Sequence, residues 1–511
     1  MKSALKYLLL CLLIFFSFFF GAASNPLFDT SEGTFAQGSM TMAQGGDFLT
    51  PYMDGRPDFD NPPLIYWLQT ASVNLFGAGE LAFRLPSVLA ACGWVLLILF
   101  FVKDTRNEEM AFNSAFIACS SVIVSVFAKL AVADILLNMF LAGSMFAVYR
   151  HFETGRKKYV YLAFAAAGLG AVTKGPVAAL VPFAVSALFF LSAGRMKEWV
   201  RAVFSPVGIG IMLLVALPWY VVEYMEYGDA FINGFLAKNN PGRFSGAAEG
   251  QGGGFAYYIP LLLAGLLPGT SLLFSVLKRL RPLWNDFFSR YMMIWFFFVF
   301  IFFALSGTKL PHLILSGMTP LFILCAYVFN NHRKKVLFAV PVFIYFAVLL
   351  CLPLIIPSFA AKVNSTASAE MLLEAARRLD MSYTVPVAAM LAVSLVMSFI
   401  RTLSYRTFVA VLAFFTVISL NVMYIPLVAD IKQAPVKEAA LYTAERNIKV
   451  NLWTASVPSF NVYYGKNADK NLPDEGGFVF IDSDKTGKIG RPYVTIKEWA
   501  GYRLIQVAEA E

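Results

Sequence analysis

The sequence predicts a polytopic α-helical membrane protein with a small α+β domain at its C-terminal end. Of its 511 residues, 58% are hydrophobic and only 14% are charged, against about a quarter charged in a typical soluble protein. Apolar stretches long enough to cross a bilayer as helices recur along most of the chain. These observations exclude a soluble globular enzyme. The net charge of +9 does not indicate nucleic-acid binding, because the basic residues lie mostly in short loops.

The apolar stretches predict about thirteen membrane spans. The first follows Lys2 and Lys6 and also fits a signal peptide, with small residues at Gly21–Ser24 for cleavage. We predict an uncleaved span there, because the second span must run in the opposite direction for the loop charges to fit. The predicted spans are Tyr7–Ala23, Arg84–Val102, Ala111–Phe127, Val132–Tyr149, Tyr159–Val172, Val177–Leu191, Pro206–Val222, Tyr257–Leu277, Tyr291–Leu305, Leu313–Asn330, Val336–Ile356, Val385–Ile400 and Phe408–Leu427.

The loops divide into two sets by charge. One set is short and basic, which indicates the cytoplasmic side. It carries Lys103, Arg106, Arg150, Arg156, Lys157, Lys158, Arg195, Lys197, Arg201, Lys278, Arg279, Arg281, Arg290, Arg333, Lys334, Lys335, Arg401 and Arg406. The other set is longer and poorer in Lys and Arg. With an odd number of spans, the pattern predicts a cytoplasmic N-terminus and an outer, periplasmic C-terminal segment.

Two domains follow from this pattern. Residues 1–428 form the membrane domain, in which 24–84 is a first periplasmic loop and 223–256 is a second, Gly-rich near its end. Within the first loop, Thr34–Met42 and Leu64–Phe76 are amphipathic and predict helices on the membrane surface. Residues 429–511 form the C-terminal α+β domain. Its β-rich runs are Val450–Trp453, Phe460–Tyr464, Phe478–Ile481, Tyr493–Ile496 and Tyr502–Val507.

Charged residues gather at the outer ends of the predicted spans. A charge inside hydrocarbon costs about 3 kcal/mol or more, so such residues are the first candidates for function. Carboxylates and cations on one outer face suit a site that binds an anionic lipid headgroup and removes a proton from an acceptor. The candidates are Asp29, Glu32, Asp58, Asp60, Asp134, Lys174, Arg243, Lys309 and His312.

Each candidate also has a simpler explanation. Asp134 fits a helix-start acid or an ion pair with Lys129. Lys174 fits a snorkelling lysine, although Gly175–Pro176 place it at a helix N-terminus where an anion is favoured. His312, taken by itself, indicates an interfacial hydrogen bond rather than a metal ligand. The acidic segment 54–60 also fits a solvated turn.

A series of motifs gives a more specific indication. In chain order they are Glu32, Gly46–Pro51, Asp60–Trp67, Phe83–Ser87, Asp134–Leu137, Thr173–Pro176, Gly228–Phe231, Asn239–Phe244, Tyr257–Pro260 and Gly307–His312. This series resembles the polyprenyl-phosphate-dependent glycosyltransferases, the bacterial relatives of protein O-mannosyltransferases and of the aminoarabinose transferase that modifies lipid A. The resemblance covers most of the membrane part.

The resemblance implies a GT-C fold of about thirteen spans in a bacterial inner membrane. It implies that a sugar moves from a polyprenyl phosphate, usually undecaprenyl phosphate, to an acceptor on the periplasmic face, with inversion. The acceptor is lipid A, another envelope glycolipid or glycan, or a protein. No nucleotide is needed, which agrees with the lack of a phosphate-binding Gly loop.

The resemblance also implies roles for residues. Glu32 is our first choice as the base that deprotonates the acceptor, Asp29 is the alternative, and Asp60 is a neighbour that orients the acceptor or binds a divalent cation if one is used. The residues expected to hold the donor phosphate are Lys174, Arg243, Lys309 and His312, and those expected to support the site are Asp134 and Tyr66.

The chain departs from the family pattern at three positions. Ser31 stands where relatives have Asp, Thr34 where they have Arg, and Asn61 where they have Lys. The Gly-rich run lacks the metal-binding histidine of some relatives, so a metal ion stays open. These departures also fit an alternative function: a non-catalytic lipid-binding or transport protein that retains the GT-C fold.

Overall fold

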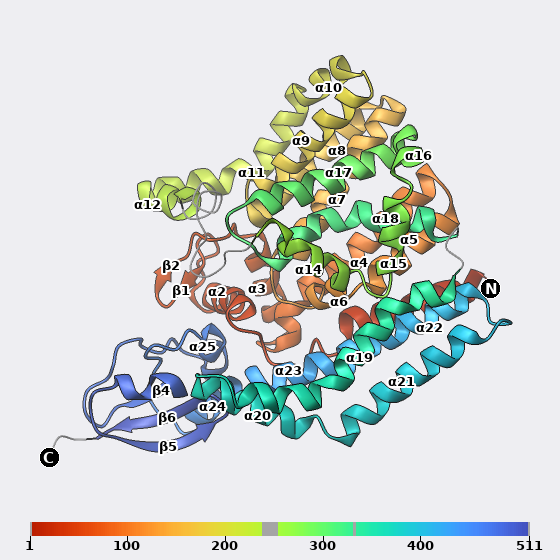
Figure 1. Cartoon of the computed structure of the whole chain (residues 1–511). Coiled ribbons are helices and arrows are strands. Elements are labelled where there is room, and N and C mark those ends of the chain that lie inside the picture. The colour runs from red at the N-terminus through yellow and green to blue at the C-terminus, as the bar shows by residue number, and fades with distance from the viewer. Residues whose placement is uncertain (1–2, 238–253, 331–333, 509–511) are drawn as a thin grey trace.

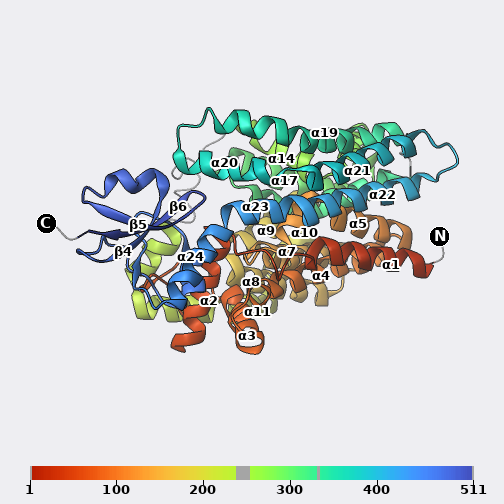
Figure 2. The same ribbon diagram turned by 90° about the horizontal axis from the view of Figure 1, so that it is seen from below.

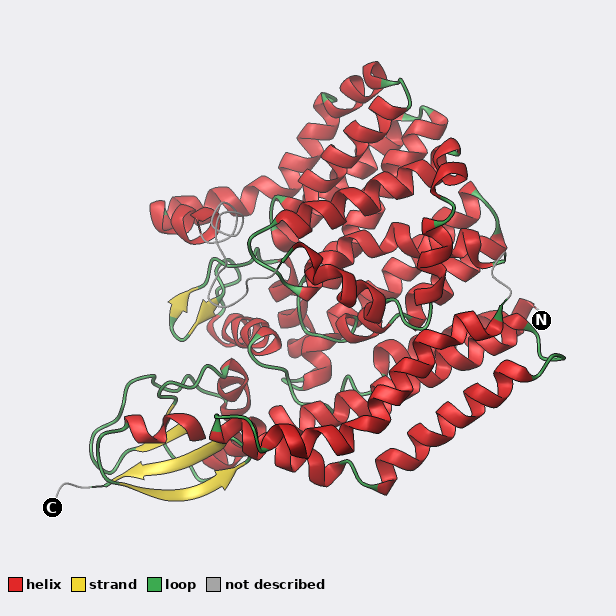
Figure 3. Cartoon of the chain, viewed as in Figure 1, coloured by secondary structure: helices red, strands yellow, loops and turns green. Residues whose placement is uncertain are grey.

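The chain is described by a computed structural model that covers residues 3–237, 254–330 and 334–508. Within these ranges, strands occur only in a short hairpin at Tyr52–Pro57 and in a small C-terminal sheet, and helices make up most of the rest (Figure 3). In the first part of the chain the elements are α1 Ser3–Ile14, η1 Phe15–Phe19, α2 Ser31–Gly45, β1 Tyr52–Met53, β2 Arg56–Pro57, α3 Leu64–Phe76, α4 Glu80–Thr105, α5 Glu108–Ser120, α6 Val122–Phe127, α7 Asp134–Thr154, α8 Lys157–Lys174, α9 Val177–Ser192, α10 Met196–Val203, α11 Pro206–Tyr227, α12 Asp229–Ile232 and η2 Asn233–Ala237.

The second part begins after the gap at 238–253. Its elements are η3 Phe255–Tyr257, α14 Tyr258–Gly265, α15 Thr270–Leu277, α16 Leu280–Asn285, α17 Phe287–Leu305, η4 Pro311–Gly317, α18 Met318–Phe329, α19 Lys335–Ala360, α20 Thr366–Arg378, α21 Met381–Phe399, α22 Tyr405–Ile418, η5 Ser419–Tyr424, α23 Ile425–Lys432, α24 Ala434–Glu445, β3 Val450–Asn451, α25 Pro458–Tyr464, β4 Phe478–Asp482, η6 Ser483–Lys488, β5 Tyr493–Trp499 and β6 Tyr502–Val507.

All of the predicted apolar runs are mainly helical, but two are interrupted. Ala111–Phe127 breaks at Ser121 between α5 and α6, and Tyr257–Leu277 breaks around Pro268 between α14 and α15. Among the described residues, eight helices are long and apolar enough to cross a membrane, and three shorter apolar helices accompany them. The chain is therefore a multi-pass membrane protein, whereas the number of thirteen spans stays a prediction.

The connections divide between two ends of the helix bundle, as the loop charges predict. At one end the basic loops contact each other: Arg106 pairs with Asp286, Arg290 donates to the Ser192 carbonyl (3.0 Å), and Lys335 donates to the Ile400 carbonyl (2.6 Å). At the other end lie the β1–β2 hairpin, α12 and the C-terminal sheet, on the left of Figure 1, with the N-terminus on the right. Seen from below, the helices run side by side between these ends (Figure 2). Which end faces the cytoplasm is not fixed by the fold and stays a prediction.

The C-terminal sheet has the strand order β3-β4-β6-β5. β3 is parallel to β4, while β6 is antiparallel to both β4 and β5. Helices α24 and α25 pack against it, burying Phe460 and Phe480 with ring centroids 5.0 Å apart. The prediction of a strand at Phe460–Tyr464 is wrong. Pro458 starts a helix there and Gly465, with φ of 76°, ends it, because these two residues favour a helix start and a helix end.

The membrane core is rich in aromatic residues whose polar groups are hydrogen-bonded. The indole of Trp94 donates to the Thr319 hydroxyl (2.9 Å), and that of Trp295 donates to the Ser316 carbonyl (2.9 Å). Both indoles are fully buried, so each bond avoids an unpaired donor in the interior. These bonds tie α4 and α17 to η4 and α18, which places η4 beside the cavity described below.

Candidate functional site

A cavity of about 160 Å³ lies between α7, α9, α17 and η4. Its lining is of two kinds: side chains that would contact a hydrocarbon chain, and polar side chains, of which Asp134, Lys174 and His312 lie together at what we call the polar end. The apolar residues are Leu137, Leu141, Val177, Leu180, Val181, Phe235, Phe302, Phe303, Leu310 and Leu313. The polar ones are Asp60, Asn61, Asp134, Asn138, Lys174, Ser306, Thr308, His312 and Ser316. Such a cavity suits an amphiphile with a charged head and an apolar tail.

Asp134 organises the polar end. It opens α7, and its carboxylate accepts a hydrogen bond from the Lys174 ammonium, while His312 Nε2 lies 3.9 Å from the same oxygen. The alternative of an ion pair with Lys129 is wrong, since Lys129 instead donates to the Phe20 carbonyl (3.1 Å) and to Asn421. Asp134 thus holds a lysine and a histidine, from α8 and η4, at one wall of the cavity.

Lys174 is the last residue of α8, directly before the N-terminus of α9. Gly175 adopts φ of 84°, and a side chain there would meet Phe235 at 3.1 Å, so glycine permits both the turn and the close approach of η2. Lys174 therefore lies where a helix N-terminus adds positive potential. An anion at this end would face both the ammonium and that potential.

Asp60 reaches the cavity from the first loop. Phe59 packs on Tyr227 and Phe231, with ring centroids 5.1 and 5.6 Å away, which seats the loop on α11 and α12. The Asp60 backbone N–H donates to the Asp58 carboxylate (3.1 Å). Asp60 is exposed at the mouth of the cavity. Its carboxylate is therefore accessible to a group arriving from the outer end.

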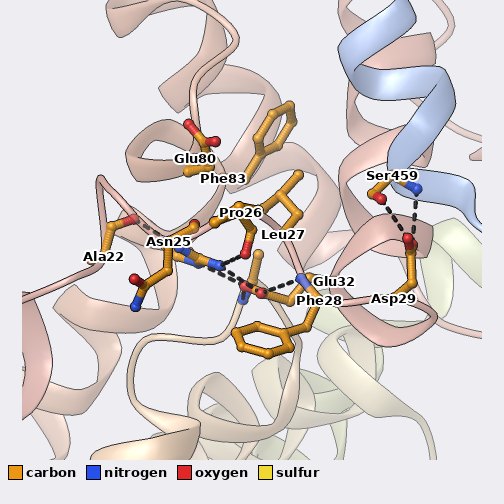
Figure 4. A network of polar contacts seen from close by, with 12 residues as sticks. Ala22, Asn25, Pro26, Leu27, Phe28, Asp29, Glu32, Glu80, Phe83 and Ser459 are labelled. Carbon is orange, nitrogen blue, oxygen red and sulfur yellow. Dashed lines mark hydrogen bonds and ion pairs between the residues drawn. The ribbon is translucent and has the colours of Figure 1, made fainter. Parts of the chain in front are cut away.

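Glu32 lies elsewhere, in a fully buried ion pair with Arg84. The Arg84 guanidinium binds both carboxylate oxygens, at 2.8 and 2.7 Å, and the backbone N–H groups of Phe28 and Ala131 donate to them as well, at 2.9 and 2.7 Å. Glu32 is 0% exposed and Arg84 2%. The rest of the guanidinium donates to the carbonyls of Ala22, Asn25 and Pro26 (Figure 4). The sequence places Arg84 at the start of a span and in the motif Phe83–Ser87 but predicts no role for it, although an arginine inside the apolar run Phe83–Pro86 is a sign of a buried ion pair.

Asp29 points away from Glu32 in Figure 4 and toward the C-terminal domain. Its carboxylate accepts hydrogen bonds from the backbone N–H of Ser459 (2.9 Å) and from the Ser459 hydroxyl. Burial raises the pKa of Asp29 to about 6, against the opposing effect of these two bonds. Asp29 therefore joins the first loop to the start of α25.

Two further acids of the first loop make similar contacts. The Asp54 carboxylate accepts from the side chains of Gln37 and Asn461, both at 3.2 Å, and pairs with Lys470. Glu80 pairs with Lys437 and also accepts from the Tyr463 hydroxyl (3.2 Å). Three of the seven acids in residues 24–84, namely Asp29, Asp54 and Glu80, thus contact the C-terminal domain. This role could not be predicted from the sequence, because the partners lie about 350 or more residues away along the chain.

One predicted phosphate ligand, Lys309, is not among the described residues that line the cavity. Lys309 is 5% exposed, and its ammonium donates to the carbonyls of Phe303 (3.2 Å), Ala304 (2.6 Å) and Ser306 (2.5 Å) at the end of α17. Burial lowers its pKa. Arg243 lies outside the described residues, as do Asn239–Phe244 and the Gly-rich run up to residue 253.

Tyr66 does not line the cavity, and its role in supporting the site stays a prediction. It is fully buried on α3, packs against Phe35 with tilted rings whose centroids are 5.3 Å apart, and has a strongly raised pKa because of burial and the nearby charges of Asp58 and Asp60. Besides Asn61, four polar residues that line the cavity were not among the predicted site residues: Asn138, Ser306, Thr308 and Ser316. Thr308 lies within the motif Gly307–His312, and Asn138 lies one helical turn after Asp134. Both residues could therefore have been predicted from the sequence pattern.

No group of three or more His, Cys, Asp or Glu side chains that could hold a metal ion occurs in the described part of the chain. The described residues that line the cavity include only two carboxylates, those of Asp60 and Asp134. The described residues therefore do not form a ready metal site, and no step below depends on one.

Comparison with known proteins finds similar sequences and a similar fold. Residues 60–221 match the family of dolichyl-phosphate-mannose-protein mannosyltransferases. The structure superposes on that of ArnT from Cupriavidus metallidurans bound to undecaprenyl phosphate with a TM-score of 0.80, over 99% of both chains and at 17% identity. The predicted resemblance is confirmed. The chain has the GT-C fold and is related in sequence to polyprenyl-phosphate glycosyltransferases.

Two relatives in sequence are named as arabinosyl transferases. The undecaprenyl phosphate-alpha-4-amino-4-deoxy-L-arabinose arabinosyl transferase 1 of Proteus mirabilis is 28% identical over 341 residues, which cover 66% of this chain and 61% of that protein. The corresponding transferase of Serratia proteamaculans is 30% identical over 59% of this chain and 55% of its own length. The matched part of the chain thus spans less than two thirds of either relative.

Proposed function

We propose that the protein is a membrane glycosyltransferase that takes a sugar from a polyprenyl phosphate, such as undecaprenyl phosphate, and transfers it to an acceptor on the periplasmic face of the inner membrane. One observation carries the proposal. A single cavity joins an apolar wall, a lysine and a histidine held by Asp134, and an accessible carboxylate, Asp60. A lipid-linked sugar phosphate needs all three kinds of surface.

The donor lipid occupies the cavity with its phosphate at the polar end. The first isoprene units contact the walls formed by α9 and α17, represented by Leu180 and Phe302. The Lys174 ammonium and the N-terminus of α9 neutralise the phosphate, and His312 donates to it when protonated. Asp134 acts by fixing Lys174 rather than by touching the donor.

Transfer then requires one proton acceptor. The acceptor hydroxyl gives its proton to Asp60 as its oxygen bonds to the anomeric carbon, and the bond from that carbon to the phosphate oxygen breaks. The polyprenyl phosphate leaves as an anion, so the site mainly aligns the two reactants and stabilises the charge that develops on the phosphate. Asp60 is preferred over Glu32 because the four hydrogen bonds of Glu32 and its burial keep it from any acceptor. The assignments of Glu32 and Asp29 as the base stay predictions.

The acceptor class is part of the proposal: lipid A, another envelope glycolipid or glycan, or a protein. The names of the Proteus and Serratia relatives support an aminoarabinose-type donor, and no other feature of the site distinguishes the sugars.

The test is transfer by purified, reconstituted protein supplied with a radiolabelled polyprenyl-phosphate sugar and a membrane extract. Wild type moves label to a new product, and Asp60→Asn lowers the rate by about 10²–10⁴-fold, as expected for loss of a general base. Asp474→Asn, an exposed acid of the C-terminal domain, is the matched control and keeps wild-type activity.

Three outcomes contradict the proposal in different ways. Full activity of Asp60→Asn would show that another carboxylate is the general base. Binding of the labelled donor without transfer by wild type supports the alternative of a non-catalytic lipid-binding protein with the same fold. Failure of the wild-type protein to bind any polyprenyl phosphate would refute the proposal.

A further inference from the structure

A second cavity lies at the opposite, basic end of the bundle, between α16 and the first half of α17. Its volume is about 540 Å³, and it is lined by Leu280, Arg281, Trp284, Asn285, Met293 and Phe297. The side chains from α17 are apolar, whereas Arg281 and Asn285 from α16 supply the polar groups. It shares no residue with the donor cavity.

Arg281 is the charged group of this groove and is not used by the protein itself. It is exposed and makes no hydrogen bond or ion pair with any described residue. Lys278 is likewise exposed in the turn before it. The nearby acid, Asp286, is engaged by Arg106 and by Ser289. The mouth of the groove therefore carries an uncompensated positive charge.

Trp284 forms one wall in a fixed position. Its backbone carbonyl accepts from Arg290 Nε (2.7 Å), the Arg290 guanidinium lies 5.3 Å from its ring centroid, and Arg290 also donates to Ser192. The Trp284 side chain nevertheless stays 46% exposed. A held, half-exposed tryptophan beside free cations is typical of the depth at which lipid headgroups meet acyl chains.

The positive-inside rule explains why cations gather at this end of the bundle, but it does not explain why one of them borders an apolar groove. Basic pockets beside membrane helices recruit anionic lipid headgroups because the cation contacts the phosphate while the helices contact the chains. A zwitterionic lipid would fill the same groove without compensating the charge of Arg281.

We propose that this groove is a binding site for an anionic phospholipid. The Arg281 guanidinium contacts the headgroup phosphate, Asn285 lies beside it, and an acyl chain runs along Met293 and Phe297 of α17. The site is independent of the proposed transferase activity, since it lies in the opposite half of α17 from the donor cavity.

The experiment compares binding of phosphatidylglycerol and phosphatidylcholine with identical acyl chains to the full-length protein in neutral detergent, by native mass spectrometry. Wild type binds phosphatidylglycerol more tightly. Arg281→Gln weakens phosphatidylglycerol binding about fivefold, the effect of one basic residue at an anionic headgroup, and leaves phosphatidylcholine binding unchanged. Arg281→Lys retains most of the preference.

Lys197→Gln is the matched control, because it removes an exposed cation of α10 at the same end but outside the groove. It is expected to bind both lipids as wild type does. The melting temperature of Arg281→Gln without lipid should equal that of wild type, since Arg281 has no hydrogen-bond or ion-pair partner among the described residues. Equal binding of the two lipids by wild type, an Arg281→Gln variant that keeps the preference, or an equal loss in Lys197→Gln would each overturn the proposal.

Discussion

Replacing Glu32 by glutamine tests whether the carboxylate of Glu32 has a structural or a catalytic role. In the folded protein the two carboxylate oxygens accept four hydrogen bonds: two from Arg84 and one each from the backbone N–H groups of Phe28 and Ala131. A glutamine can accept at one position only. Whichever way its amide is turned, its NH₂ group faces two donors, and the Arg84 charge is left buried without a counter-ion.

The expected cost follows from that geometry. Breaking a buried ion pair by removing one partner costs about 3–5 kcal/mol, mostly from the charge left behind. Glu32→Gln should therefore unfold at a clearly lower temperature than wild type in detergent. Glu80→Gln is the control, because its ion pair with Lys437 is partly exposed and worth about 0–1 kcal/mol.

Transfer measured per folded molecule completes the test. The molecules of Glu32→Gln that remain folded should keep activity close to wild type, whereas Asp60→Asn should lose about 10²–10⁴-fold at an unchanged melting temperature. The reasoning is refuted if Glu32→Gln melts like wild type and loses transfer by that factor, because Glu32 would then be the base.

Three more predictions concern the surroundings of the cavity. Asp54→Asn should change stability by no more than about 1 kcal/mol, since its pair with Lys470 is partly exposed. It should nevertheless slow transfer about tenfold or more by loosening the hairpin that precedes Asp60; unchanged turnover would show that docking does not position the loop. Burial raises the pKa of Asp29 to about 6 in the folded protein, so its contribution to stability is fully present below about pH 4 and is lost as pH rises to about 6. Asp29→Asn should remove this part of the pH dependence of unfolding. Identical pH–stability profiles of wild type and Asp29→Asn would contradict this prediction. Lys309→Met should destabilise by about 1–3 kcal/mol through three unpaired carbonyls without raising the KM for the donor; a raised KM at normal stability would make Lys309 a phosphate ligand.

Much of the fold could be predicted from local pattern. Apolar length gave the helical segments, and loop charge separated the two ends, because bilayer thickness and the charge rule act on short stretches of sequence. The strand predicted at Phe460–Tyr464 failed because β-branched and aromatic content outweighed Pro458 and Gly465, which start and end a helix.

The site was predictable where its residues lie in motifs that resemble those of the family. Asp134, Lys174 and His312 meet in the cavity, as the resemblance implies. The roles of the acids could not be read in the same way, because Glu32 faces Arg84 and Asp29 faces Ser459 only after folding brings distant segments together. The residue type indicates which chemistry a side chain can perform. Its burial and its hydrogen-bond partners determine whether a carboxylate joins two domains, holds another side chain in place or takes part in the reaction.

The most direct test of the donor site is photo-crosslinking with a polyprenyl phosphate that carries a diazirine on its first isoprene units. The account predicts label on peptides of α9 and α17 that contain Leu180 and Phe302. Excess unlabelled polyprenyl phosphate should abolish the label, and neutral polyprenol should not. Label confined to other helices, or equal competition by the neutral alcohol, would contradict the assignment of this cavity to the donor lipid.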